Sequence, residues 1–188
     1  MIRVVCSSIQ NKDWRRLNIC NTDGQRDGSS EKYQINLVKQ ITKSNYTKTK
    51  LPRLNKRTLE LKYLRCPMTN NKQNVDDGLD WTEDFDGLQT IGEHMLFYNL
   101  KFITEGGGGQ TRTLRCVSEF IETQLKFFKK NNTSNMYFIN ILDGDVSHFR
   151  KGCFTYLLTL PEYQGVNKEY IFIGDMLEFQ IWFNSRFM

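Results

Sequence analysis

Three polar side chains in the middle of the chain have the types and the spacing to bind a metal ion and act on a phosphate. Asp86 is followed by twelve residues and then by Asn99-Leu100-Lys101. In a strand, residues two apart lie on the same face, about 7 Å from each other. Carboxylate and amide oxygens bind Mg²⁺, and an ammonium group stabilises a hydroxide or a charged phosphate. We therefore predict a metal and phosphate site, with Asp86 and Asn99 as ligands and Lys101 as the cation.

The residues around this motif predict a β-hairpin. Side chains from 98 to 103 alternate between two faces, as they do in a strand. One face is Tyr98, Leu100 and Phe102, and the other is Asn99, Lys101 and Ile103. Asp86 lies in a separate short run, 85–88, which we interpret as the second arm of the hairpin. The four glycines at 106–109 should form a turn, because glycine loses much backbone freedom on folding and has no side chain to pack.

A helix and a buried strand are predicted after the hairpin. From Thr111 or Thr113 onward, apolar residues recur at helical spacing, and Asn131 and Asn132 are expected to end the helix. Residues 136–142 are a continuous apolar run, typical of a strand covered on both faces. Strand, helix and strand in this order predict a crossover between parallel neighbours. In the last third, 154–160, 170–174 and 178–183 are expected as further strands, or as a terminal strand and helix.

The remaining sequence predicts an α/β domain with a central mixed sheet flanked by helices. Residues 1–79 form its N-terminal part, with a helix over about 30–44, a strand over about 59–66 and a loop over 67–80. Ser29 or Ser30 should cap that helix, with Glu31 in the first turn. Residues 80–188 form the catalytic core. Lysines between 39 and 50 either belong to a solvated helix end and linker or contact phosphates.

Length and composition restrict the possible classes of protein. A chain of 188 residues fits one domain, and its net charge of +5 permits a polyanionic partner. Five widely spaced cysteines without a Cys-x-x-Cys pair, together with two histidines, argue against a zinc site and a disulfide framework. No run approaches the ~20 apolar residues of a membrane span. We expect a cytoplasmic protein that has no contact with a membrane.

The motif resembles the PD-(D/E)XK nuclease superfamily, and within it the type II restriction endonucleases. The resemblance covers about residues 80–183 and is carried by Asp86, Asn99-Leu100-Lys101, the Gly-Gly-Gly-Gln-Thr-Arg-Thr-Leu-Arg run at 107–115 and Asn-Ile-Leu-Asp-Gly-Asp at 140–145. It implies a restriction-endonuclease-like core and Mg²⁺-dependent, site-specific hydrolysis of double-stranded DNA. It also implies a homodimer, because symmetric cleavage of a duplex needs two active sites. Members are usually longer, so the chain is expected to be a truncated or C-terminal portion.

Other residues complete the expected site. The superfamily motif has Asp or Glu where this chain has Asn99, an uncharged ligand. Glu105 has the same strand parity as Asn99 and is our candidate for the missing carboxylate. We expect Gln110, Arg112 and Arg115 at the helix start to contact DNA, although either arginine could instead belong to a buried ion pair.

Several alternatives remain open at this point. The main rival function is a catalytically inactive DNA-binding or interaction module that keeps the nuclease fold. A nucleotide site at the glycines lacks both a Gly-Lys-Ser/Thr motif and a G-x-G-x-x-G motif, so we expect no nucleotide cofactor. Asp143 and Asp145 could face a ligand or could end a strand in an Asp-Gly turn. The acids Asp80, Glu83 and Asp84 are auxiliary metal candidates.

Overall fold

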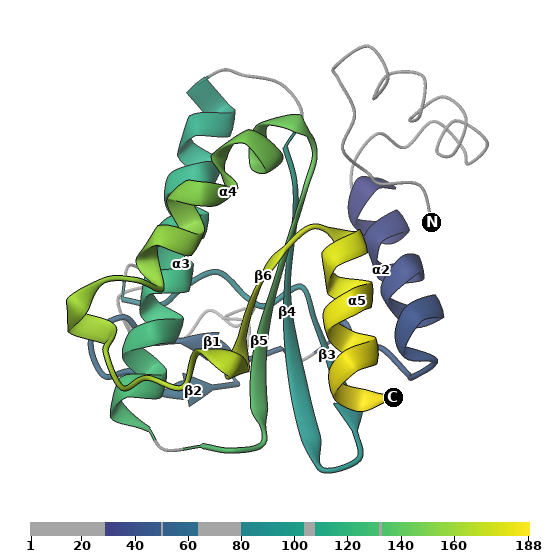
Figure 1. Ribbon diagram of the computed structural model, residues 1–188, viewed down its shortest axis with the longest axis horizontal. Helices are drawn as coiled ribbons and strands as arrows, with labels where there is room; N and C mark the ends of the chain where they lie inside the picture. The colour runs from purple at the N-terminus through teal and green to yellow at the C-terminus, as the bar shows by residue number, and fades with distance from the viewer. Residues whose placement is uncertain (1–28, 50, 64–79, 104–107, 132) are drawn as a thin grey trace, which may run out of the picture.

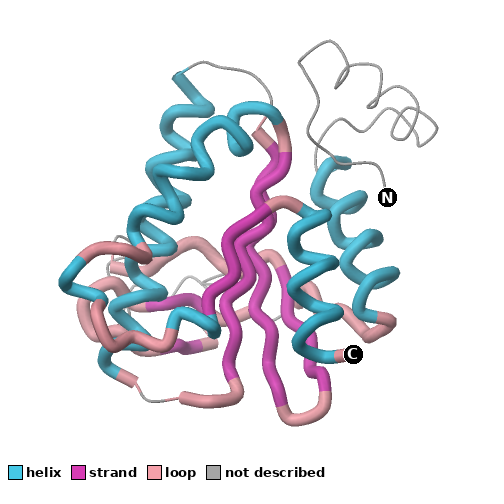
Figure 2. The backbone as a smooth tube through the Cα atoms, in the orientation of Figure 1, coloured by secondary structure: helices cyan, strands magenta, loops and turns pink. Residues whose placement is uncertain are grey.

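A mixed four-stranded sheet is the centre of the structure, a computed structural model that describes residues 29–49, 51–63, 80–103, 108–131 and 133–188. The strand order is β3-β4-β5-β6, and the described helices cover both faces of the sheet (Figures 1 and 2). This arrangement confirms the predicted α/β class with a central mixed sheet flanked by helices.

The predicted hairpin is formed by β3 (Gly87–Ile91) and β4 (His94–Phe102). The strands pair antiparallel, with Gly87 opposite Tyr98 and Ile91 opposite His94. Gly92 turns the chain between them with φ 60°, a conformation that glycine adopts without the steric cost of a Cβ atom. β4 continues the sheet through a parallel pairing with β5 (Met136–Asp143), which in turn pairs in parallel with β6 (Ile171–Gly174).

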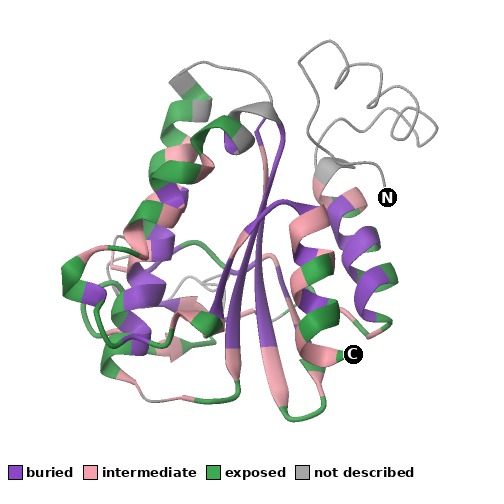
Figure 3. Ribbon diagram, viewed as in Figure 1, coloured by how far each residue is buried: buried purple, intermediate pink, exposed green. Residues whose placement is uncertain are grey.

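Two layers of helices enclose the sheet. On one face lie α2 (Ser29–Thr42) and α5 (Met176–Phe187), and on the other lie α3 (Gly108–Lys130) and α4 (Asp145–Leu157) (Figure 1). Strand side chains alternate between these layers. Tyr98 and Ile139 pack toward α2 and α5, whereas Phe97 and Phe138 pack toward α3. β5 is buried from its second residue onward (Figure 3), as expected for a strand covered on both faces.

The helix that connects β4 to β5 begins earlier than predicted. α3 starts at Gly108, so the expected turn at 106–109 is wrong for Gly108 and Gly109, while 106 and 107 lie outside the described residues. The first turn of a helix leaves its N–H groups without intrahelical partners, so glycine is tolerated there more easily than in the interior. Thr113 Oγ1 also donates to the carbonyl oxygen of Gly109 at 3.1 Å. The helix ends at Lys130, directly before Asn131 as predicted.

The last third of the chain follows the second of the two alternatives, a terminal strand and helix. Residues 171–174 form β6, and 178–183 lie inside α5. Asp175 begins α5 with a capping box, because its Oδ1 accepts the N–H of Glu178 and Oε2 of Glu178 accepts the N–H of Asp175, both at 2.9 Å. A strand at 154–160 is wrong, since α4 continues to Leu157. Thr155 Oγ1 donates to the carbonyl oxygen of Lys151, which satisfies its hydroxyl within the helix.

The N-terminal part contains the predicted helix, although Ser29 and Ser30 belong to the helix and do not precede it as caps, and it contains only part of the predicted strand. α2 spans Ser29–Thr42 and buries Ile35, Val38 and Ile41. The strand expected over 59–66 is reduced to β2 (Leu61–Lys62), which pairs with β1 (Arg53–Leu54), a strand that the sequence did not indicate. Residues 64–66 and most of the predicted loop, 67–79, lie outside the described residues.

Candidate functional site

Asp86 and Lys101 lie next to each other at one end of the β3–β4 pair. The N–H of Asp86 donates to the carbonyl oxygen of Tyr98 at 2.7 Å, which fixes this residue beside the polar part of β4. Oδ2 of Asp86 lies 3.7 Å from Nζ of Lys101 and accepts the N–H of Leu100 at 2.6 Å. The Asp86 and Lys101 side chains are 21% and 20% exposed, so a ligand can reach a pair that is already largely desolvated.

Two carboxylates, one largely buried and one exposed, lie near the Lys101 ammonium group. Burial raises the pKa of the Asp86 carboxyl above its ordinary value, against the opposing effects of the Lys101 ammonium and the Leu100 N–H. Nζ of Lys101 also donates to Oε2 of Glu83 at 3.3 Å, and the Glu83 side chain is 65% exposed. One ammonium group therefore lies between a largely buried carboxylate and an exposed one.

Asn99 is held by a buried network of amide groups. Its Nδ2 donates to Oδ1 of Asn140 at 3.0 Å, and Nε2 of Gln124 donates to the same oxygen at 3.1 Å. Nδ2 of Asn140 donates to Oε1 of Gln124 at 2.8 Å and to the carbonyl oxygen of Phe172 at 3.2 Å. The side chains of this network are all buried. Its hydrogen bonds connect β4, β5, α3 and β6, and they fix which way each amide points.

The same face of β4 lines a cavity of about 110 Å³. Its lining includes Asn99 and Lys101 of β4, Trp81 and Glu83 from the segment before β3, and Phe120 of α3. Because Nδ2 of Asn99 donates to Asn140, its carbonyl oxygen is the atom that this side chain can present to the cavity. The cavity therefore combines an amide oxygen, a cation and an acid next to the Asp86 carboxylate.

The donor types near Lys101, a carboxylate and an amide oxygen, are ones that Mg²⁺ accepts, with water completing most of its shell. Mg²⁺ keeps several waters and commonly takes one or two carboxylates from a protein. Asp86 supplies one carboxylate, Asn99 an amide oxygen, and Glu83 lies on the other side of Lys101. Within the part of the chain that the structure describes, no three acid, cysteine or histidine side chains form a metal-binding group. Glu105, our candidate for an additional carboxylate, lies outside that part.

The residues predicted to contact DNA lie in the first turns of α3. Arg112 and Arg115 are exposed, so the alternative of a buried ion pair is wrong for both. Gln110 belongs to the first turn of the same helix, and its side chain lies outside the described part of the chain. The lysines at 39 and 43 belong to α2 and its C-terminal end, on the opposite face of the sheet. Arg112 and Arg115 therefore form a surface separate from those lysines.

Asp143 is a structural residue rather than an open ligand. Its side chain is fully buried, Oδ2 accepts Nε2–H of Gln34 at 2.7 Å, and Oδ1 accepts the N–H of Met176 at 3.0 Å. Burial raises the pKa of this carboxyl to about 7, although both hydrogen bonds favour its ionised form. The carboxyl therefore joins the end of β5 to α2 and to the start of α5.

The three auxiliary acids have different partners. Glu83 contacts Lys101, as described above, while Asp80 pairs with Arg57 at 2.9 Å and Asp84 with Arg53. Of these three acids, Glu83 is the one that lies beside the candidate site.

Sequence reasoning missed Asn140 and Gln124. The available signals were an asparagine inside the apolar run 136–142 and a glutamine within the apolar stripe of α3. Buried polar side chains are hydrogen-bonded, so polar residues at positions predicted to be buried indicate a partner inside the core.

Comparison of the chain with models of protein families, with curated proteins and with solved structures found no match. Among the described helices, none is both long and apolar enough to span a membrane. The function must therefore be argued from the site itself.

Proposed function

We propose that this protein is a Mg²⁺-dependent endonuclease that hydrolyses phosphodiester bonds of double-stranded DNA at specific sites, as type II restriction enzymes do. The observation that carries the proposal is the Asp86–Lys101 pair, which joins the residue before β3 to β4 with 3.7 Å between Oδ2 and Nζ. Asn99 lies two residues before Lys101 on the same face of β4 and opens on the same cavity. Both partners are only about one-fifth exposed, which strengthens their interaction with a charged substrate.

The side chains have separate roles in this proposal. Asp86 and Asn99 would hold the ion, which supplies polarisation of the phosphate and a bound water of lowered pKa. Lys101 donates to the attacking oxygen or to a phosphate oxygen on which negative charge increases. Its neighbours Asp86 and Glu83 keep the ammonium in place. Since protons compete with metal for a carboxyl of raised pKa, the reaction should slow as the pH falls through the range in which Asp86 takes up a proton.

A specific observation favours a second candidate, an inactive DNA-binding module with the same fold. Asn99 is neutral, and its amide is held by Asn140. Among the described residues, Asp86 is therefore the one largely buried carboxylate close to Lys101. Loss of one acid from a two-acid metal site would reduce metal affinity and leave the DNA-contacting surface unchanged.

Plasmid digestion with and without Mg²⁺ distinguishes these candidates. The endonuclease should give discrete fragments with Mg²⁺ and none without it, and Asp86→Ala should abolish cleavage while DNA binding persists. Glu122→Gln is the matched control, because Glu122 pairs with Lys126 on α3 and is not part of the site. Binding of DNA without cleavage at any Mg²⁺ concentration would establish the inactive module. Cleavage by Asp86→Ala at the parental rate would refute the assignment of Asp86.

A further inference from the structure

The N-terminal ends of α3 and α4 lie at the edge of the sheet where Lys101 is located. β4 and β5 are parallel neighbours, with Lys101 opposite Leu142, so the chain leaves both strands at the same edge. α3 begins six residues after the end of β4, and α4 begins two residues after the end of β5. The two helices contact each other and run along one face of the sheet away from this edge (Figure 1).

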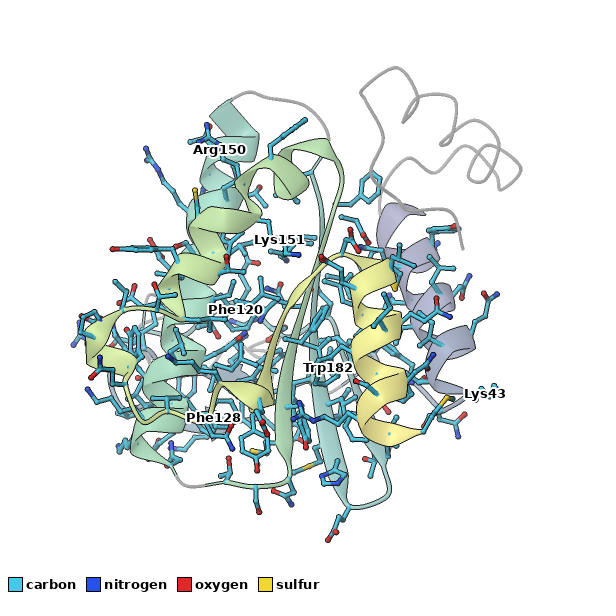
Figure 4. All side chains as sticks on the ribbon, in the orientation of Figure 1. Lys43, Phe120, Phe128, Arg150, Lys151 and Trp182 are labelled. Atoms are coloured by element: carbon cyan, nitrogen blue, oxygen red, sulfur yellow. The ribbon has the colours of Figure 1, made fainter. Side chains whose placement is uncertain are left out.

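This edge presents three exposed arginines. Arg112 and Arg115 lie on α3, and Arg150 lies on α4. Within the described part of the chain, none of the three makes an ion pair. The neighbouring Lys151 differs, because it points toward α5 and bonds to Glu178 there, whereas Arg150 lies on the outer side of α4 (Figure 4). Arg150 therefore adds to the positive charge of the α3 surface.

An exposed aromatic ring directly precedes Arg150 in α4. Phe149 is 82% exposed, the highest exposure of any large hydrophobic side chain in the described chain. Side chains of α3 from 111 to 116 are also exposed or half-buried, and burial begins only at Val117 (Figure 3). Both helices thus have exposed side chains near their N-terminal ends, two arginines on α3 and an apolar ring followed by an arginine on α4.

We propose that Phe149, Arg150, Arg112 and Arg115 form a double-stranded-DNA contact surface, called here the α3–α4 surface. The arginines would contact phosphates, and the Phe149 ring would pack against a base or insert between two base pairs. The positive charge of the arginines favours a polyanionic partner. The exposed ring favours a polyanion that has flat apolar groups, such as the bases of DNA, on which the ring can stack. The inference rests on the proposed function, which places the scissile phosphate beside Lys101 at the same edge.

The test measures binding of the full chain to a fluorescent DNA duplex by anisotropy, at several salt concentrations, in an Asp86→Ala background that prevents cleavage. Arg150→Ala should reduce the slope of log affinity against log salt by about 0.9. Phe149→Ala should weaken binding by about 5- to 150-fold and leave the slope unchanged, because stacking releases no counterions.

Two controls change similar side chains elsewhere. Lys39→Ala removes an exposed cation from α2, and Ile181→Ala removes a 64% exposed apolar side chain from α5. Both lie on the opposite layer of helices, so both variants should bind DNA as their parent does. Circular dichroism establishes that each variant is folded before its affinity is compared.

The possible outcomes separate this inference from the proposed function. DNA binding that neither Phe149→Ala nor Arg150→Ala alters would overturn the α3–α4 surface and leave the endonuclease proposal standing. A change of oligomeric state in Phe149→Ala, with DNA affinity unchanged, would overturn it in favour of a protein interface. If the parental chain neither binds nor cuts DNA, the proposed function itself is wrong.

Discussion

Replacing Asn99 by aspartate tests both the amide network and the metal site. The substitution adds the carboxylate that the nuclease motif usually has, which by itself should tighten Mg²⁺ binding. In this structure, however, it also replaces the N–H donor that Oδ1 of Asn140 accepts at 3.0 Å by an oxygen. Asn140 cannot simply reverse its amide, because its Nδ2 already donates to Gln124 and to Phe172. A carboxylate oxygen of the new aspartate and Oδ1 of Asn140, both hydrogen-bond acceptors, would therefore face each other in the protein interior.

The cost can be estimated from the loss of that hydrogen bond. Oδ1 of Asn140 keeps one donor, Nε2 of Gln124 at 3.1 Å, but the new carboxylate oxygen that faces it is a buried acceptor without a donor. This costs about 1–3 kcal/mol, which corresponds to a decrease in Tm of roughly 2–12 °C for a domain of this size. The new carboxyl group is also desolvated, because Asn99 is only 2% exposed. Its pKa should therefore be raised, so the stability deficit should shrink at low pH, where the protonated group can donate to Asn140.

Thermal denaturation of Asn99→Asp during a Mg²⁺ titration measures both effects. Without Mg²⁺ the variant should melt below the wild type, and with Mg²⁺ its Tm should rise more than that of the wild type, because the ion binds only the folded state. Asn140→Asp is the matched control, since it makes the same chemical change in the same network but points toward Gln124 and Phe172. It should be destabilised without rescue by Mg²⁺. If Asn99→Asp is as stable as the wild type and responds equally to Mg²⁺, the reasoning about both the network and the ion is refuted.

Two further predictions concern Lys101 and Asp143. Lys101→Met should keep the fold, because an aliphatic chain of similar bulk replaces the lysine stem, and should lower the cleavage rate by about 10²- to 10³-fold; a large fall in Tm would instead indicate a structural ion pair. Since the pKa of Asp143 is about 7 in the folded protein, compared with 3.8 ordinarily, its carboxyl stabilises the fold below about pH 4, and this contribution is lost as the pH rises through 7. The loss amounts to about 4 kcal/mol, so urea unfolding at several pH values should show a weaker pH dependence for Asp143→Asn. An unchanged dependence would contradict the assignment to this group.

The helices and strands that were predicted correctly are those in which the local spacing of apolar residues shows which side chains are buried. Alternation around Asn99 and helical spacing from Leu114 to Phe128 both reflect which side chains face the core, and both elements are present. The start of α3 could not be predicted in this way, because glycine propensity disfavours a helix, whereas the first turn, whose N–H groups have no intrahelical partners, tolerates glycine. The segment 154–160 failed for a related reason, since its aromatic and β-branched residues suggest a strand by composition alone.

The sequence allowed the residues of the candidate site to be named, but not the hydrogen bonds that join them to the rest of the sheet. The spacing of Asp86, Asn99 and Lys101 in the sequence suggests one strand pair, and the register between two sequential antiparallel strands is set by a short turn. The pairing of Asn99 with Asn140 depends on the register between β4 and β5, which are separated by the whole of α3. No local pattern reports such a register, so the amide network and the burial of Asp143 emerged only from the folded chain.

The amide network gives a physical reason for a neutral residue at position 99. Its bonds tie β4 to β5, β6 and α3 at the level of the candidate site, so the positions of Asp86 and Lys101 depend on the same contacts that hold the sheet together. A carboxylate at position 99 would strengthen the metal site and weaken these contacts. Because the amide groups of the network are buried, bulk water does not readily replace a lost partner, and the penalty falls on the strand that carries Lys101. If the proposed metal site is correct, metal affinity and the rigidity of the site are opposed at position 99, and Asn99 is the residue that favours rigidity.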